Sequence, residues 1–235
     1  MVASLRAFLP AGFRRPVGGA RVRPSRSRSP DAVGGVWTKP AMDALIQKAK
    51  EGDAEALESV LRRYAPDVAR IAHRMLGPTA DLDDVIQEAL FQVARSIRSF
   101  QGTSQFSTWL YRVVSNVARM HLRAKASRPA LDLAEPTQLA RRPAAQSTPE
   151  QHAQRSEDVR ALYRCLDALS EKKRTVLVLH DLEGVAAAEI ARIVDVPLLT
   201  VRTRLFYARK ELYAALARDP ELAHLDVLMH AEDER

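Results

Sequence analysis

Apolar residues recur at the spacing of α-helices along two stretches of this chain, and a segment containing four prolines separates them. Over residues 41–125 and again over residues 153–217, apolar positions fall three or four residues apart, so each predicted helix has one face to bury. The intervening residues 126–152 show little periodicity, which is typical of a linker. The sequence therefore predicts an all-α protein with two small helical domains joined by a flexible linker.

Composition supports this fold class and excludes several others. Aromatic residues make up 6% of the chain, and no stretch alternates β-branched and polar residues as a strand would. A charged residue interrupts every apolar run before it reaches the roughly 18 residues of a membrane-spanning helix, so we expect no membrane insertion. The single cysteine, Cys165, cannot form an internal disulfide and fits the core of its helix. We expect a reducing, cytoplasmic location.

The net charge of +7 comes from the beginning of the chain. Residues 1–40 hold eight basic residues and one acid, in a segment rich in Arg, Pro, Gly and Ser that lacks the apolar residues to form a core. We expect a disordered basic extension, which resembles an organelle transit peptide and would equally fit a start assigned upstream of Met42. At the other end, residues 218–235 are predicted to be an acidic, solvated tail.

Four helices are expected in the first domain. Gly77-Pro78 ends the second, Asp81 begins the third, which should run to about Phe100, and a short loop leads to the fourth. The expected inward stripe of the fourth helix comprises Trp109, Leu110, Val113, Val117 and either His121 or Leu122.

The second domain contains the clearest motif. After a helix that Ser170 could cap and Gly184 ends, the segment VAAAEIARIVDVPLLTVRTRLFYARKEL reads as helix, tight turn and helix. Opposite the apolar stripe, the second helix carries Thr203, Phe206, Tyr207 and Lys210, flanked by Arg202 and Arg209. Cations, a hydroxyl and exposed aromatics suit a DNA groove. The alternative is a solvated basic face on a structural helix.

A second motif lies in residues 100–128, where aromatic residues interleave with cations. Residues 101–128 hold five basic residues and no acid. Unpaired bases stack on aromatic rings while cations follow the backbone, so this block favours single-stranded DNA binding. Core packing is the better interpretation for Trp109, which shares the apolar stripe, whereas DNA binding is the better one for Arg112, Arg119 and Arg123.

A third feature is the polar patch that Asp84, Gln87, Glu88 and Phe91 form on the predicted third helix. By itself this pattern favours solvated surface over a partner interface. No histidine pair, carboxylate cluster or Gly-rich phosphate loop accompanies it, so we expect no catalytic residues, no metal site and no cofactor.

Together, DLDDVIQEALFQV, FSTWLYRVVSNVA and EIARIVDVPLLTVRTRLFYARKEL resemble, in this order, the extracytoplasmic-function (ECF) sigma factors with regions two and four only. The resemblance covers about residues 42–217. It implies a bacterial transcription initiation factor without enzymatic activity, whose partners are core RNA polymerase (the β′ clamp helices and the β subunit), promoter DNA in single- and double-stranded form, and an anti-sigma factor.

The resemblance also implies a role for each motif. Contacts with the β′ clamp helices would come from Asp84, Gln87, Glu88 and Phe91. Contacts with the melted minus-ten element would come from Thr103, Ser104, Phe106, Trp109, Arg112, Arg119 and Arg123. Contacts with the minus-thirty-five duplex would come from Thr200, Arg202, Thr203, Phe206, Tyr207 and Lys210.

This chain departs from the family pattern at three positions. Ala186 stands where a capping Ser or Thr is common, and Asp195 and Leu199 stand where glycines are common. Asp tolerates a left-handed backbone and Leu does so poorly, so these residues bear on the turn geometry.

Two other interpretations remain open from the sequence. A helix-turn-helix regulator that does not depend on polymerase would share the second domain, since response-regulator output domains have a similar motif. A helical interaction protein of an organelle would fit the Arg-rich beginning of the chain.

Overall fold

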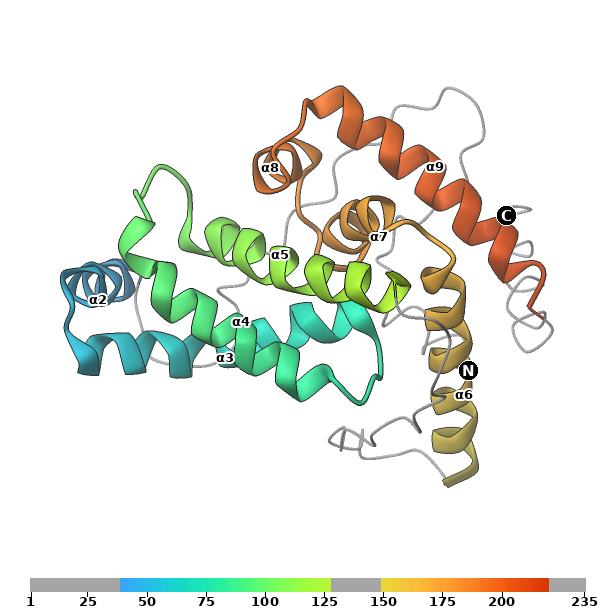
Figure 1. The fold of residues 1–235 in the computed structure, drawn as a ribbon, viewed down its shortest axis with the longest axis horizontal. Coiled ribbons are helices and arrows are strands. Elements are labelled where there is room, and N and C mark those ends of the chain that lie inside the picture. The colour runs from blue at the N-terminus through green and yellow to red at the C-terminus, as the bar shows by residue number, and fades with distance from the viewer. Residues whose placement is uncertain (1–38, 128–148, 220–235) are drawn as a thin grey trace. The chain divides into compact units, whose positions relative to one another are not determined.

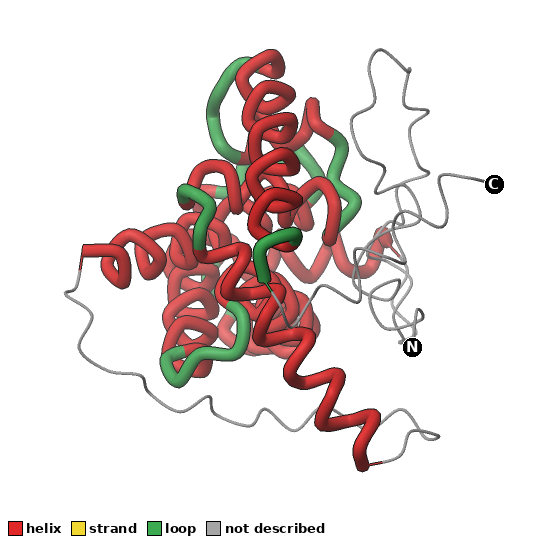
Figure 2. Tube along the Cα trace, turned by 90° about the vertical axis from the view of Figure 1, so that its right-hand side faces the viewer, coloured by secondary structure: helices red, strands yellow, loops and turns green. Residues whose placement is uncertain are grey.

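The computed structural model describes residues 39–127 and 149–219, and across these ranges every regular element is a helix (Figures 1 and 2). The chain divides into two compact units. The first holds helices α2 to α5, and the second holds α6, α7, α9 and most of α8. The expected all-α class is thus confirmed. No helix in the described ranges is long and apolar enough to cross a bilayer.

The first unit begins with α2 (Lys39–Glu51) and the long helix α3 (Ala54–Leu76), which continues through Pro66. Asp53 caps α3 by accepting a hydrogen bond from the Ala56 amide at 3.0 Å, and Gly77 ends it with a φ of 79°. Met42, the alternative start, lies inside α2 and packs in the core.

Helices α4 (Leu82–Ser96) and α5 (Phe106–Ser127) complete this unit. Asp81 precedes α4 as expected, but its side chain makes no capping hydrogen bond and instead faces His121, with 3.5 Å between Asp81 Oδ2 and His121 Nε2. The α-helix ends at Ser96, and a 3-10 turn over Ile97–Ser99 carries the chain to the predicted end at Phe100.

The expected inward stripe of α5 is wrong by part of a turn. Trp109, Val113 and Val117 are only half-buried. Small side chains line part of the buried face and let α5 pack closely. That face consists of Phe106, Leu110, Tyr111, Val114, Ser115 and Ala118.

Aromatic rings form a cluster where α3, the end of α4 and the start of α5 meet. The ring of Phe106 lies 4.9 Å from Tyr64, 5.3 Å from Phe100 and 5.1 Å from Trp109, measured between centroids. Phe106 itself is only 6% exposed. Such contacts add to the burial of apolar area, so this cluster fixes the loop between α4 and α5 at both ends.

The second unit contains α6 (Pro149–Asp167), α7 (Glu171–Leu177), α8 (Ala187–Ile193) and α9 (Leu198–Leu216). Between α7 and the next turn, the chain continues as a π-helical segment over Val178–Leu182. Ser170 precedes α7 as predicted but makes no capping hydrogen bond through its side chain.

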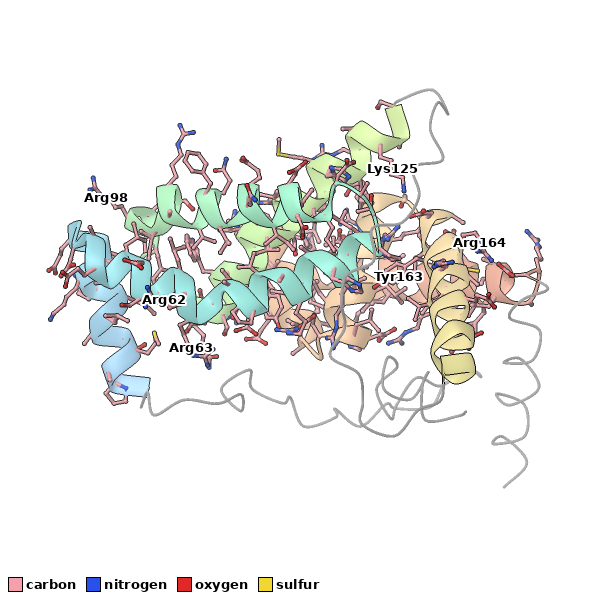
Figure 3. The ribbon with its side chains drawn as sticks, turned by 90° about the horizontal axis from the view of Figure 1, so that it is seen from below. Arg62, Arg63, Arg98, Lys125, Tyr163 and Arg164 are labelled. Carbon is pink, nitrogen blue, oxygen red and sulfur yellow. The ribbon has the colours of Figure 1, made fainter. Side chains whose placement is uncertain are left out.

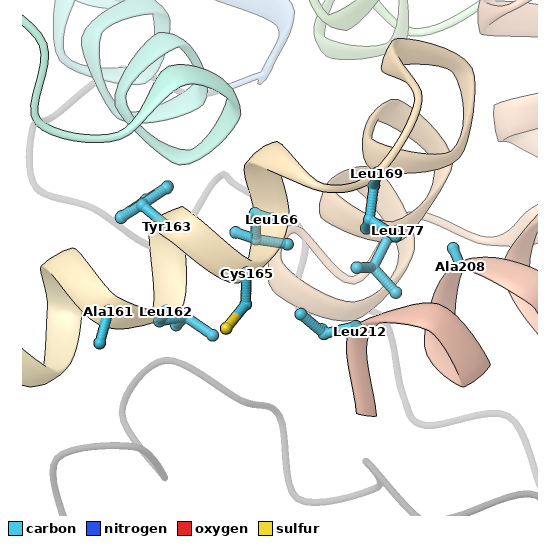
Figure 4. Packing of buried hydrophobic residues seen from close by; sticks show 9 residues of the cluster. All are labelled: Ala161, Leu162, Tyr163, Cys165, Leu166, Leu169, Leu177, Ala208 and Leu212. Carbon is cyan, nitrogen blue, oxygen red and sulfur yellow. The ribbon is translucent and has the colours of Figure 1, made fainter. Parts of the chain in front are cut away.

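Side chains from α6, α7 and α9 share one apolar core (Figure 4). Cys165 belongs to it, and burial raises the pKa of its thiol, which keeps the sulfur protonated. The core interpretation of this cysteine is therefore confirmed. The members of the core are Ala161, Leu162, Tyr163, Cys165, Leu166, Leu169, Leu177, Ala208 and Leu212.

The turn between α8 and α9 needs one left-handed residue, and Asp195 supplies it with a φ of 52°. Leu199 stands where the family commonly has glycine, and a left-handed backbone there would strain it. It lies instead in the first turn of α9 and has no positive φ. The Ala186 carbonyl accepts hydrogen bonds from the amides of Glu189 and Ile190, at 2.9 and 3.0 Å. Its side chain has no polar atom, so α8 begins without a side-chain cap at this position.

The predicted linker, residues 126–152, is shortened at both ends by helix, because α5 reaches Ser127 and α6 begins at Pro149. Its remaining residues, like the predicted basic extension before Lys39 and the tail beyond Asp219, lie outside the described residues.

Replacing Phe106 by Ala should lower the free energy of unfolding of the first unit by about 3–5 kcal/mol, because it leaves a cavity inside the aromatic cluster. Urea unfolding followed by tryptophan fluorescence measures this, since Trp109 touches the same ring. Phe91→Ala is the matched control, because the Phe91 side chain is 59% exposed. Equal stabilities of the two variants would contradict a core role for Phe106.

Candidate functional site

One face of α4 is exposed along two turns. Asp84, Gln87, Glu88 and Phe91 are spaced as i, i+3, i+4 and i+7, and all four are exposed. The Phe91 ring is 59% exposed beside these polar groups, and Gln92 donates a hydrogen bond of 2.7 Å to Glu88. We call these four residues the α4 face. An exposed aromatic ring bordered by carboxylates is a feature of interaction surfaces.

A basic face runs along α5, where no acidic residue occurs. Arg112 and Arg123 are exposed, Arg119 is half-buried, and Met120 between them is 66% exposed. The helix ends with Lys125 in its last turn (Figure 3). We call Arg112, Arg119 and Arg123 the α5 face; its single sign of charge suits a polyanion.

The loop before α5 has its polar residues at or near the surface, whereas Phe106, the first residue of α5, lies in the core. Thr103 is exposed and Ser104 is half-buried, beside Gly102 with a φ of 72°. Phe106, predicted as a base contact, is instead a core residue, because its ring fills the space between Tyr64 and Trp109. A base could not stack on it in this structure. Trp109 packs on the same cluster, as the core interpretation predicted, although it is only half-buried.

Helix α9 has the two-sided character that the sequence predicted. Val201, Leu205, Ala208 and Leu212 are buried. The Phe206 and Tyr207 rings are about half exposed and meet edge to face, with 5.3 Å between their centroids. Exposed residues on the side opposite this stripe form what we call the α9 face: Arg202, Thr203, Phe206, Tyr207 and Lys210, with Thr200 half-buried at its start.

Arg209 was predicted to flank the α9 face, but its guanidinium is bonded to Asp181. Its Nε donates to Asp181 Oδ2 at 2.9 Å and its second nitrogen donates to Asp181 Oδ1, so the pair is bidentate. Asp181 is almost fully buried in the π-helical segment, and His180 Nδ1 lies 2.7 Å from Asp181 Oδ1. No local sequence pattern predicts this pair, because its two residues lie 28 positions apart in the chain.

The electrostatics of this pair follow from its geometry. Burial would raise the pKa of Asp181, but hydrogen bonds from His180 and Arg209 and the Arg209 charge outweigh it, so the pKa lies below its usual value. The hydrogen bonds to Asp181 raise the pKa of Arg209. Asp181 is therefore a carboxylate held against a guanidinium.

No cluster of His, Cys, Asp or Glu that could hold a metal ion occurs in residues 39–127 or 149–219.

Comparison with known proteins extends these observations. The family description Sigma-70 region 2 matches residues 60–128, and Sigma-70, region 4 matches residues 159–212. The chain is 36% identical over 172 residues to the ECF RNA polymerase sigma-E factor of Haemophilus influenzae, covering 71% of this chain and 90% of the relative. It is also 36% identical over 174 residues to the ECF RNA polymerase sigma-E factor of Escherichia coli (strain K12), covering 72% and 90%.

Among solved structures, CnrH in complex with the cytosolic domain of CnrY matches the fold with a TM-score of 0.51 at 22% identity, covering 75% of this chain and 97% of that chain.

Asp181→Asn should lower the free energy of unfolding of the second unit by about 3 kcal/mol near neutral pH, because it leaves the Arg209 charge without its partner. Since the pKa of Asp181 is lowered by folding, the stabilisation exists above the unfolded pKa of about 3.9 and is lost as the pH falls through the lower folded pKa. Urea unfolding followed by circular dichroism should show the full difference near pH 7 and a smaller one as the pH falls below the unfolded pKa of about 3.9. A constant difference over this pH range would contradict this assignment.

Proposed function

The chain belongs to the ECF RNA polymerase sigma factors, and from this premise we propose how its surfaces divide the work of transcription initiation. As a sigma factor of this group, the protein binds core RNA polymerase and directs promoter recognition, promoter melting and initiation. The observation that carries the proposal is that each unit exposes a cationic helix face over an intact apolar core. Sigma factors act through binding, and we assign no catalytic residue.

The α4 face is the polymerase contact in this proposal. Protein interfaces concentrate their binding energy in a few anchors, and the exposed Phe91 ring is such an apolar anchor. The charges of Asp84 and Glu88 would orient the two proteins as they bind. We place this face against the β′ clamp helices. The β subunit is the further contact within polymerase.

The α5 face and the loop before it bind the melted minus-ten element in this proposal. Cations that follow a backbone and a loop that receives an extruded base match the needs of single-stranded binding. Thr103 and Ser104 remain candidates for the base, whereas the buried ring of Phe106 now supports the loop from beneath. Trp109 belongs with Phe106 as a support.

The α9 face reads the minus-thirty-five duplex in this proposal. Arg202 and Lys210 suit phosphates or guanine edges, and the exposed Phe206 ring suits a thymine methyl group. Thr200, Thr203 and Tyr207 offer hydroxyls to the backbone. A second helix in the major groove is the usual docking geometry of this motif.

Binding to a single promoter by two units explains why polymerase is required. Each face offers only a few contacts, and holding both units on one promoter raises the effective concentration of the second contact. The free protein should therefore bind DNA weakly. We further propose a cytoplasmic location, where polymerase and promoters are, and control by an anti-sigma factor.

The alternative of a helix-turn-helix regulator independent of polymerase is not favoured. The first unit matches Sigma-70 region 2 over residues 60–128, which such a regulator would not need. The decisive experiment is a pull-down with core polymerase followed by promoter-dependent run-off transcription. Failure of both would overturn the proposal.

Phe91→Ala and Glu88→Gln should each weaken binding to core polymerase, Phe91→Ala by roughly tenfold or more, because a central aromatic anchor is lost. Glu58→Gln on α3 is the matched control, since Glu58 is exposed and pairs with Arg62 of the same helix. Fluorescence anisotropy of labelled protein titrated with core polymerase measures the affinities. If Glu58→Gln weakened binding as much as Glu88→Gln, the α4 face would not be the contact.

Arg112→Ala combined with Arg123→Ala should reduce binding of the polymerase-bound protein to single-stranded minus-ten DNA. The slope of log affinity against log salt should become shallower by about 1.4, since each phosphate contact to a single strand contributes about 0.7. Arg62→Ala, an exposed arginine of α3 (Figure 3), serves as the control. An unchanged slope in the double variant would place the DNA elsewhere.

A further inference from the structure

Helix α9 must be held in one orientation if its exposed face is to read base pairs. Its apolar contacts through Val201, Leu205 and Leu212 attach it to the core, but such contacts have no preferred direction. Two ion pairs also join α9 to earlier segments of the unit: Arg209 with Asp181, and Lys173 with Glu211. These two pairs differ in burial and in geometry.

The Asp181–Arg209 pair has the geometry of a fork. Two nitrogens of the guanidinium meet two oxygens of one carboxylate, which fixes a direction as well as a distance. Asp181 is 4% exposed and is also bonded by His180. The Lys173–Glu211 pair, in contrast, is a single contact of 2.6 Å between partly exposed side chains. A lysine ammonium can turn about its contact, whereas the arginine fork cannot.

Arg209 lies close to the α9 face along the helix, so its bond to Asp181 can set the orientation of that face. Arg209 follows Phe206 by three residues and Arg202 by seven, so these side chains lie in adjacent rows of the helix. With a helix radius of about 5–6 Å including side chains, a rotation of about 10° moves a side chain by about 1 Å. Displacements of that size are enough to break hydrogen bonds to base edges.

We propose that Asp181 is a positioning residue for recognition of the minus-thirty-five duplex. By binding Arg209 it sets the rotation of α9, so that Arg202, Phe206 and Lys210 meet the groove in register. Arg209, although it lies on the reading helix, serves this bond and not DNA contact. This inference rests on the proposed function of the α9 face.

The test uses the full chain with core polymerase and a library of promoters randomised over the minus-thirty-five segment. Relative initiation rates are measured for the unchanged protein, for Asp181→Asn and for the control Glu211→Gln, which removes the acidic partner of the Lys173–Glu211 contact between α7 and α9. Single mismatches should cost the unchanged protein and Glu211→Gln roughly 5- to 150-fold. For Asp181→Asn the same mismatches should cost less than about threefold, because the misaligned face no longer distinguishes base pairs.

A second variant separates positioning from folding and from direct DNA contact. Arg209→Lys keeps the positive charge but loses the fork, and it should flatten the preference profile as Asp181→Asn does. All variants are compared at a temperature well below their unfolding transitions, where circular dichroism shows each to have the helix content of the unchanged protein. An unchanged profile in either folded variant would overturn the inference. A further contradicting result would come from Arg209→Ala. If its preference profile were unchanged and its slope of log affinity against log salt were reduced by about 0.9, Arg209 would be a phosphate contact.

The promoter library distinguishes failure of this inference from failure of the proposed function. If the unchanged protein showed no preference within the library, the α9 face would not read the minus-thirty-five segment, and the proposed function of that face would fail. If the unchanged protein showed a narrow preference that Asp181→Asn retained, only the positioning role would fail.

Discussion

Every helix in units this small must bury one stripe of its surface in a shared core, and only the remaining stripes are free to bind. In α9 the buried residues Val201, Leu205 and Leu212 take one side, which leaves Phe206 and Tyr207 about half exposed on the other. The same division in α4 leaves Phe91 outside. Because burying apolar area is the main source of stability, large rings left outside a good core need a reason other than stability.

Periodicity predicted most of the architecture because helices are local structures. The Gly77 and Gly184 stops, the left-handed Asp195 and the two-sided α9 all follow from residues close together in sequence. The faces proposed for binding could be predicted in the same way, since exposure on an amphipathic helix follows from the positions of its apolar residues.

The inward face of α5 shows the limit of this reasoning. Val113 and Val114 are adjacent and equally apolar, so the stripe could be drawn through either, and the packing of Phe106 against Tyr64 decided between them. That contact joins residues distant in sequence. The same contact moved Phe106 from the predicted DNA surface to the core, because an aromatic ring suits both places and only tertiary structure distinguishes them.

The Asp181–Arg209 pair lies beyond sequence patterns for the same reason, and its burial has a further meaning. A buried ion pair contributes little net stability compared with apolar residues of similar volume, because both charges lose their hydration. An apolar pair at this contact would hold α9 about as firmly but would accept many rotations about the helix axis. A fork of two hydrogen bonds accepts few. A helix that only packs has no use for this restriction, whereas a helix whose outer face must match base pairs in register does.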